Sequence, residues 1–129
     1  QLDLGEYVTY MSMVNRTAEI LPLFDVSVLP SLDEGLGISI MEAQIMSVPV
    51  IATNVGGIPS LVKDGQPGLL VPPNDADALA EAIIKVVSDK ELARRLGAQA
   101  REFILKEFNS DLMVEDTLEV YRKVIDGKK

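Results

Sequence analysis

The sequence predicts an α/β fold, with a parallel sheet covered on both faces and followed by C-terminal helices. Over the first 73 residues, short β-rich runs alternate with segments of helical length. Such alternation is typical of βαβ units, whose strands run parallel. The run VPVIAT (48–53) is almost wholly apolar, as expected for a strand buried on both faces. From Asp75 onward, apolar residues recur at helical spacing among many charges, which predicts packed helices.

Four runs have the composition of strands, and the three segments between them have the length of helices. Pro22 interrupts the first helical segment, and the third is short. Turn residues at 63–68 lead into the last strand. The expected strands are YVTYM (7–11), DVSVLP (25–30), VPVIAT (48–53) and GLLV (68–71), and the expected helical segments are TAEILPLF (17–24), GISIMEAQIMS (37–47) and GGIPSLV (56–62).

Three amphipathic helices are expected to complete the domain by packing on the sheet. The first begins with Asp75-Ala-Asp77, a D-x-D pattern that also occurs in metal sites. Here the pattern follows two prolines and begins an Ala-rich helix, where a carboxylate accepts hydrogen bonds from the free helix amides. We therefore interpret Asp75 and Asp77 as helix capping and expect no metal. The three helices are expected at 75–89, 91–108 and 111–125.

Composition excludes several classes of protein. The 129 residues carry a formal net charge of -8, and the sequence pI is near 4.4. A nucleic-acid partner is not expected, because it would require clustered Lys and Arg. Cysteine and histidine are both absent, so any catalysis would use carboxylates, hydroxyls or backbone amides. No transmembrane segment or signal peptide is visible, and we expect a cytoplasmic protein or one peripheral at the cytoplasmic membrane face.

The loop from Pro30 to Gly37 has the position and composition of a ligand-binding loop. It follows an expected strand and enters a helix, and open parallel sheets bind ligands at the carboxyl ends of their strands. Gly35 and Gly37 permit positive φ and close approach of a ligand to the backbone. The amides at the start of the helix would favour an anionic or polar ligand.

Two interpretations apply to Glu42. Ser39 and Glu42 fit the capping box S-x-x-E, in which the glutamate bonds the amide of the cap residue. Alternatively, the helix is apolar on nearly every side, so that Glu42 is expected to be buried and to need partners. No basic residue lies between Arg16 and Lys63, which leaves hydroxyl donors from the protein or a ligand. A ribose diol could donate two hydrogen bonds to such a carboxylate.

The stretch from Phe24 to Ile83 closely resembles the C-terminal, donor-binding domain of the family 4, or group 1, retaining glycosyltransferases, which have the GT-B fold. The elements E-G-x-G, P-V-I-A-T, G-G-I-P and G-L-L-V-P-P occur in the family's order and spacing. Glu34 and Glu42 match its E-x7-E motif, and the resemblance extends from about Tyr7 to about Val124. It implies a partial Rossmann-like domain over residues 1–129, in a hexosyltransferase that needs no cofactor.

The resemblance also implies roles for individual residues. Glu34 would contact the sugar of a nucleotide-diphosphate sugar donor and would serve as the catalytic carboxylate. Gly35, Leu36, Gly37 and Ile38 would offer backbone amides to the sugar and the diphosphate, and Glu42 would hold the ribose. The sequence departs from the common pattern at Leu36, where Phe is frequent, and at Ser39, where an aliphatic residue is usual.

The resemblance implies that parts of the enzyme lie outside this chain. The family's domain has six parallel strands in the order 3-2-1-4-5-6, and its first two βα units would precede Tyr7, as would the N-terminal acceptor domain. We therefore expect strands 4, 5 and 6 to form a contiguous remnant with an exposed edge, and the run at 7–11 to be displaced from the sheet, paired non-natively or poorly ordered. The isolated chain is expected to have negligible transfer activity. The acceptor cannot be named.

Two other classes of function remain open. A glycoside hydrolase could use Glu34 and Glu42 as its two carboxylates, which would then face one cleft at roughly 5 to 10 Å separation. A non-catalytic nucleotide-binding or interaction fragment would bind without turnover.

Overall fold

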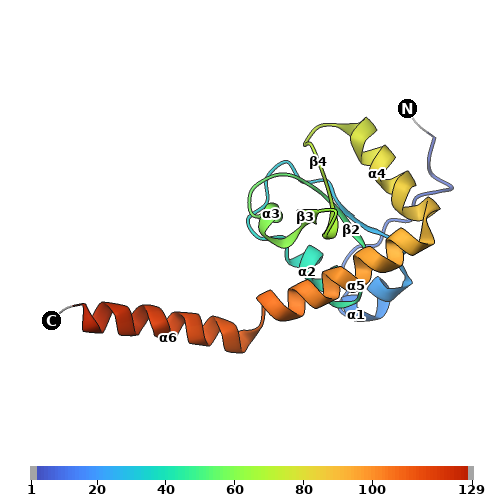
Figure 1. The fold of residues 1–129 in the computed structure, drawn as a ribbon. Coiled ribbons are helices and arrows are strands. Elements are labelled where there is room, and N and C mark those ends of the chain that lie inside the picture. The colour runs from blue at the N-terminus through green and yellow to red at the C-terminus, as the bar shows by residue number, and fades with distance from the viewer. Residues whose placement is uncertain (1–2, 128–129) are drawn as a thin grey trace.

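The chain forms a small parallel sheet with helices on both faces (Figure 1). The computed structural model describes residues 3–127, with the side chain of residue 64 excepted. The sheet order is β1-β2-β4-β3, and β1, β2 and β4 run parallel, with Val28 opposite Ile51 and Ala52 opposite Leu70. The strands are β1 (Ser27–Leu29), β2 (Val50–Thr53), β3 (Lys63–Asp64) and β4 (Pro67–Val71). The predicted contiguous remnant of three parallel strands is confirmed.

The helices follow the predicted order along the chain. Pro22 lies where the first helical segment tightens into a 3-10 turn, and Gly37 immediately precedes the second helix. The helices are α1 (Thr17–Ile20), the 3-10 helix η1 (Leu21–Leu23), α2 (Ile38–Ile45), α3 (Ile58–Leu61), α4 (Ala76–Ser88), α5 (Lys90–Glu107) and α6 (Ser110–Asp126).

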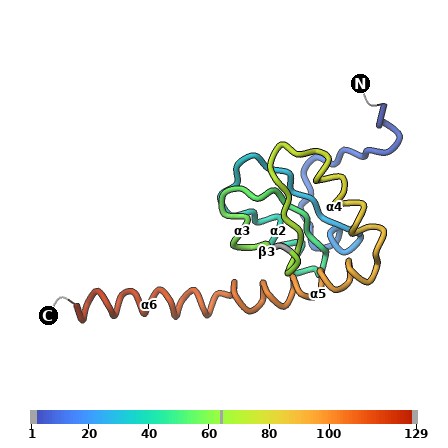
Figure 2. The backbone as a smooth tube through the Cα atoms, turned by 45° about the horizontal axis from the view of Figure 1, so that its top comes forward, coloured from blue at the N-terminus to red at the C-terminus, as the bar shows by residue number. Residues whose placement is uncertain are grey.

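Two apolar clusters hold the helices on opposite faces of the sheet. The four residues of β2 are all buried, and their side chains alternate between the faces. Val50 and Ala52 belong to the cluster formed with α2 and α3, whereas Ile51 belongs to the cluster formed with α4. The helix α5 contributes to both clusters, through Ile104 to the first and Leu96 to the second. It therefore joins the two layers (Figure 2).

The run at 7–11 is not a strand, and its predicted displacement from the sheet is confirmed. Tyr7 lies in a turn, and the four residues after it have no regular structure. The side chains of Tyr7 and Tyr10 are 83% and 89% exposed. All three residues of β1 are only partly buried, consistent with the exposed sheet edge that the remnant leaves.

The expectation that all three C-terminal helices pack on the sheet is wrong for α6. No residue of α6 is buried, and the helix extends away from the body of the fold (Figures 1 and 2). Several of its apolar side chains, including Met113, Val120 and Ile125, are more than half exposed. An amphipathic pattern indicates that one face of a helix favours burial, but it does not identify what covers that face.

Candidate functional site

The candidate site lies where the chain leaves β1 and enters α2. Because β1, β2 and β4 are parallel, the loops that follow them meet at the same edge of the sheet. The first of these loops, residues 30–37, carries Glu34, Gly35 and Leu36. This edge is where the sequence places the ligand, since open α/β sheets bind ligands at the carboxyl ends of their strands.

Two hydrogen bonds join the loop after β1 to the segment after β2. The buried hydroxyl of Thr53, the last residue of β2, donates to the Ser31 carbonyl at 2.5 Å. Three residues further along the first loop, the Glu34 carbonyl accepts a hydrogen bond from the Gly57 amide at 3.0 Å. The stretch that leads to Glu34 is therefore fixed at both of its ends.

The contact between the two loops leaves no room for side chains at Gly56 or Gly57. A Cβ added to Gly56 would lie 2.0 Å from the Glu34 carbonyl oxygen, and one added to Gly57 would lie 2.0 Å from that of Gly35. Gly56 also has a φ of +52°, a backbone conformation that favours glycine. From the sequence, these glycines were expected in a short helical segment and in the G-G-I-P element of the family resemblance, with no contact to the loop at Glu34. Two adjacent glycines after an apolar strand were the signal that could have indicated a close backbone approach.

Gly37 forms the start of α2 and shapes the end of the loop. It is the N-cap residue with φ 77° and ψ 57°, and its carbonyl accepts from the Ile40 amide at 2.9 Å. A Cβ at this position would lie 3.1 Å from the Ile40 side chain and 3.7 Å from Cγ of Glu34. The amides of Ile38 and Ser39 are the first two of the helix and have no acceptor within it. They can therefore donate to a polar or anionic group.

The two carboxylates of the E-x7-E motif have different environments. Glu34 is partly buried, whereas Glu42 is exposed to solvent on α2. Within residues 3–127, neither carboxylate takes part in any of the hydrogen bonds or salt bridges of the folded chain. Both groups are therefore available to donors from outside this chain.

Both sequence-based interpretations of Glu42 need correction. It is not buried, because α2 buries Ile40, Ala43 and Gln44, and Glu42 lies on another side of the helix. Ile38 and Ile45, which precede and follow Glu42 on its own face at helical spacing, are 67% and 41% exposed. The apolar composition of the helix therefore does not imply that all of its sides are covered.

The capping box at Ser39 is also absent. The helix begins two residues earlier than that motif requires, with Gly37 as N-cap and no side-chain cap, so Ser39 lies inside the first turn. Glu42 therefore neither caps the helix nor is buried, and both of these expectations are wrong. The hydroxyl-partner interpretation remains a prediction.

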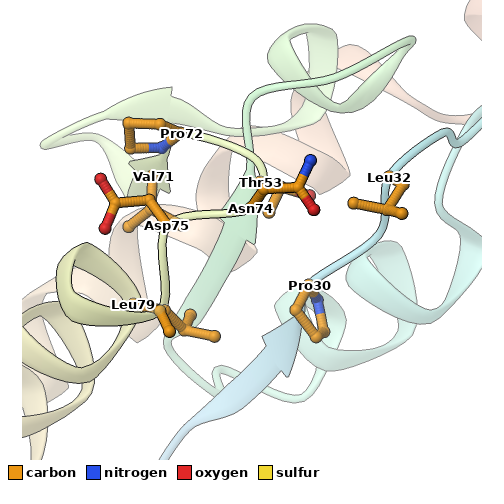
Figure 3. A pocket seen from close by; sticks show the side chains of 9 residues that line it. Pro30, Leu32, Thr53, Val71, Pro72, Asn74, Asp75 and Leu79 are labelled. Atoms are coloured by element: carbon orange, nitrogen blue, oxygen red, sulfur yellow. The ribbon is translucent and has the colours of Figure 1, made fainter.

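Two cavities border the loop after β1. The larger, about 580 Å³, is a groove between α2 and the junction of α5 with α6, and Leu36, Met41, Phe108 and Met113 line part of it. The smaller, about 230 Å³, lies at the carboxyl ends of the strands, with Pro30 and Leu32 on one side and the chain after β4 on the other (Figure 3). Neither cavity is lined by Glu34 or Glu42.

The D-x-D segment has the capping role that its sequence predicts. Asp75 is the N-cap of α4, and its Oδ1 accepts a hydrogen bond from the Ala78 amide at 2.9 Å. Asp77 lies in the first turn, where its negative charge interacts favourably with the positive end of the helix dipole. No cluster of three or more potential metal ligands occurs in the described part of the chain.

Lys63, Arg16 and Arg101 lie away from the carboxyl edge of the sheet. Lys63 is beside Pro67, at the amino end of β4, and its Nζ lies 5.5 Å from the centre of the Phe103 ring. Arg16 pairs with Glu19 before β1, and Arg101 donates to the Ile45 carbonyl at the C-terminal end of α2. A diphosphate at the start of α2 would therefore depend on backbone amides and the helix dipole for neutralisation.

Comparison with known proteins identifies the family. The family model described as "Glycosyl transferases group 1" matches residues 1–103, so the chain belongs to this glycosyltransferase family. It is 43% identical, over 92% of its length, to alpha-maltose-1-phosphate synthase of Mycolicibacterium smegmatis, of which it covers 32%. The chain thus spans about a third of the length of the curated relatives it matches.

Solved structures agree with this assignment. Sucrose-phosphate synthase from Thermosynechococcus elongatus superposes with a TM-score of 0.87 at 35% identity, covering 97% of this chain and 32% of that one. S. aureus TarM, in a complex that includes UDP, superposes with a TM-score of 0.86 at 26% identity, covering 92% of this chain and 24% of that one. The fold is therefore that of the C-terminal Rossmann-like domain of GT-B enzymes, present in part.

No helix of the described residues is long and apolar enough to cross a membrane.

Proposed function

We propose that residues 1–129 are part of the donor-binding domain of a retaining glycosyltransferase that transfers a hexose from a nucleotide-diphosphate sugar. In this proposal Glu34 contacts the sugar, and the backbone from Gly35 to Ile38 contacts the sugar and the diphosphate. Glu42 accepts hydrogen bonds from the two ribose hydroxyls. The acceptor would bind to parts of the enzyme outside this chain.

One observation carries the proposal. Two carboxylates without partners in the described chain, Glu34 and Glu42, respectively precede and follow along the sequence the free amides at the start of α2. An ionised carboxylate only accepts hydrogen bonds, and helix amides only donate them. The site therefore complements a ligand that combines hydroxyls with an anionic group, as a nucleotide-diphosphate sugar does. The UDP present in the TarM complex supports this class of ligand.

Glycoside hydrolysis gains no support from the geometry. That chemistry needs two carboxylates facing one cleft. Glu42 is exposed on α2, and neither it nor Glu34 lines the two cavities beside the loop.

Titration with UDP, GDP and ADP tests the proposal. The wild-type chain and Glu42→Ala are compared by two-dimensional NMR, which detects weak binding. Because Glu42 is exposed and unpaired in the described structure, its truncation should leave the melting temperature within about 1 °C while reducing nucleotide affinity several-fold, as loss of a charge-assisted hydrogen bond would.

Glu115→Ala serves as the matched control, because Glu115 is an exposed glutamate on α6. It should change neither the affinity nor the melting temperature. If Glu42→Ala binds nucleotides as well as the wild type does, the ribose role is wrong. If no nucleotide perturbs the wild-type spectrum at millimolar concentration, the chain is an interaction or structural fragment, and the donor-binding proposal fails.

A further inference from the structure

We infer that Thr53 and Gly57, outside the E-x7-E motif, are positioning residues that set where Glu34 meets the sugar. This inference rests on the proposed donor-binding function. Thr53 ends β2 and Gly57 precedes α3, so both belong to the neighbouring βα connection. They would act on the sugar only through the loop that carries Glu34.

The Thr53 hydroxyl fixes the first part of that loop. Its hydroxyl lies 2.5 Å from the Ser31 carbonyl oxygen and 3.5 Å from that of Leu29, so its single proton is donated to Ser31. Thr53 is 4% exposed and belongs to a strand whose four residues are all buried. Because this hydroxyl belongs to a buried strand residue, its hydrogen bond holds the Ser31 carbonyl, and with it the loop, at a fixed position relative to the sheet.

Gly57 fixes the second part of the loop. Its amide donates to the carbonyl of Glu34 itself at 3.0 Å, so the bond acts on the residue whose side chain is to contact the sugar. The space for a Cβ at Gly57 is filled by the carbonyl of Gly35, at 2.0 Å. Any side chain at this position must displace the loop on which Glu34 and Gly35 lie.

The four groups form a closed frame. Ser31 and Glu34 are three residues apart on one loop, and Thr53 and Gly57 are four residues apart on the other. Between the two bonds, the chain from Ser31 to Glu34 has little freedom to move relative to β2. Because the Glu34 side chain forms no hydrogen bond or salt bridge within the described chain, this frame restrains it through its backbone. Glu42, by contrast, is held by α2 and does not depend on the frame.

The frame predicts a selective loss of affinity for the sugar. Affinities for UDP and UDP-glucose are measured by NMR titration of the whole chain carrying Thr53→Val, Thr53→Ala or Thr53→Ser. Valine keeps the shape of threonine and alanine removes bulk, but both delete the hydroxyl, whereas serine retains it. We expect Val and Ala to weaken UDP-glucose binding about 5- to 10-fold and UDP binding less than 2-fold. Thr53→Ser should keep the wild-type ratio of the affinity for UDP-glucose to the affinity for UDP.

Gly57→Ala tests the other end of the frame. It should lower the ratio of the affinity for UDP-glucose to the affinity for UDP. A double variant, Thr53→Val with Glu34→Gln, should bind UDP-glucose no more weakly than Glu34→Gln alone, since the frame acts through that carboxylate. The matched control is Thr117→Val, which deletes an exposed hydroxyl bonded to the Met113 carbonyl on α6. Circular dichroism identifies the variants that fold, and the ratio is taken from those.

The outcomes separate this inference from the proposed function. If the wild-type chain binds both ligands and the hydroxyl-deleting variants lose affinity for both equally, Thr53 is only structural and the inference is wrong. The same conclusion follows if serine and alanine behave alike, or if neither Thr53→Val nor Thr53→Ala folds and Gly57→Ala leaves the ratio unchanged. A wild-type chain that binds neither ligand overturns the proposed function and this inference together.

Discussion

Gly97, in the middle of α5, lies directly against the backbone carbonyl of Ser47, which precedes β2. A Cβ added to Gly97 would be 2.0 Å from that oxygen and 3.6 Å from the nitrogen of Pro49. Helix α5 therefore packs on the main chain that enters β2, at the edge of the sheet opposite to the candidate site. This close approach also brings Arg101 to the Ile45 carbonyl, so α5 holds α2 at its C-terminal end.

Gly97→Ala should destabilise the fold although alanine favours helix. The helix preference contributes about 1 kcal/mol in favour of alanine, but overpacking against a main-chain oxygen costs about 1–3 kcal/mol and more when the backbone must move. We expect a lower midpoint of urea unfolding with an unchanged m-value. Gly5→Ala is the control, because a Cβ at Gly5 would meet nothing within 4 Å. An unchanged midpoint for Gly97→Ala would contradict the packing described for α5.

Asp75→Ala should lower the free energy of unfolding by about 1 kcal/mol, as expected for loss of an N-cap. The carboxylate of Asp75 accepts from the Ala78 amide, and α4 depends on this cap at its first turn. Asp77→Ala removes an equal charge two residues away but no cap, and should cost less. Equal effects of the two substitutions would mean that charge, and not the cap hydrogen bond, stabilises the start of α4.

Much of the fold could be predicted from the sequence because its signals are local. The apolar run at 48–53 and the helix that follows Gly37 each depend on neighbouring residues, and the parallel order of the strands followed from the alternation of strands and helices. The exposure of Glu42 could not be predicted in this way. It depends on how α2 is rotated about its axis when Ile40 and Ala43 meet the sheet, and an almost uniformly apolar helix does not specify that rotation.

The contact of Gly56 and Gly57 with the loop at Glu34 is also non-local. It joins residues more than twenty positions apart, and no periodicity reports it. The same limitation applies to α6, since a helical repeat predicts an amphipathic face and not the element that covers it. The candidate site residues Glu34 to Ile38 were predicted from a family motif, whereas their contact with the neighbouring loop became visible only in three dimensions.

Removal of α6 should leave the stability of the remaining domain nearly unchanged. No residue of α6 is buried, so a chain ending at Asn109 loses little apolar contact. We expect its free energy of unfolding to fall by less than about 1 kcal/mol, measured by urea denaturation. A chain ending at Gln99 is the control, since it also loses Ala100 and Ile104, which are 0% and 1% exposed, and should not fold. A large loss on deleting α6 alone would show that this helix packs on the domain.

Incubation of the wild-type chain with UDP-glucose should release no UDP above the uncatalysed rate, with or without a sugar acceptor. Stabilising the diphosphate that leaves during transfer needs positive charge close to it. The helix amides at the carboxyl edge are not joined there by Lys63, which lies at the amino end of β4, or by Arg101, which lies at the far end of α2. A partial positive charge of about half a unit at a helix start is a small fraction of what a diphosphate requires.

Release is measured by ³¹P NMR over a day, and Glu34→Gln is the control for contaminating enzymes. A rate that is well above background in the wild type and lost in Glu34→Gln would contradict this prediction. Such activity would mean that amides and Glu34 alone suffice to cleave the donor. Binding without cleavage would instead agree with a site in which the ligand contacts and the neutralising charge come from different parts of a longer enzyme. The amides that orient a diphosphate do not supply the charge that stabilises it as a leaving group.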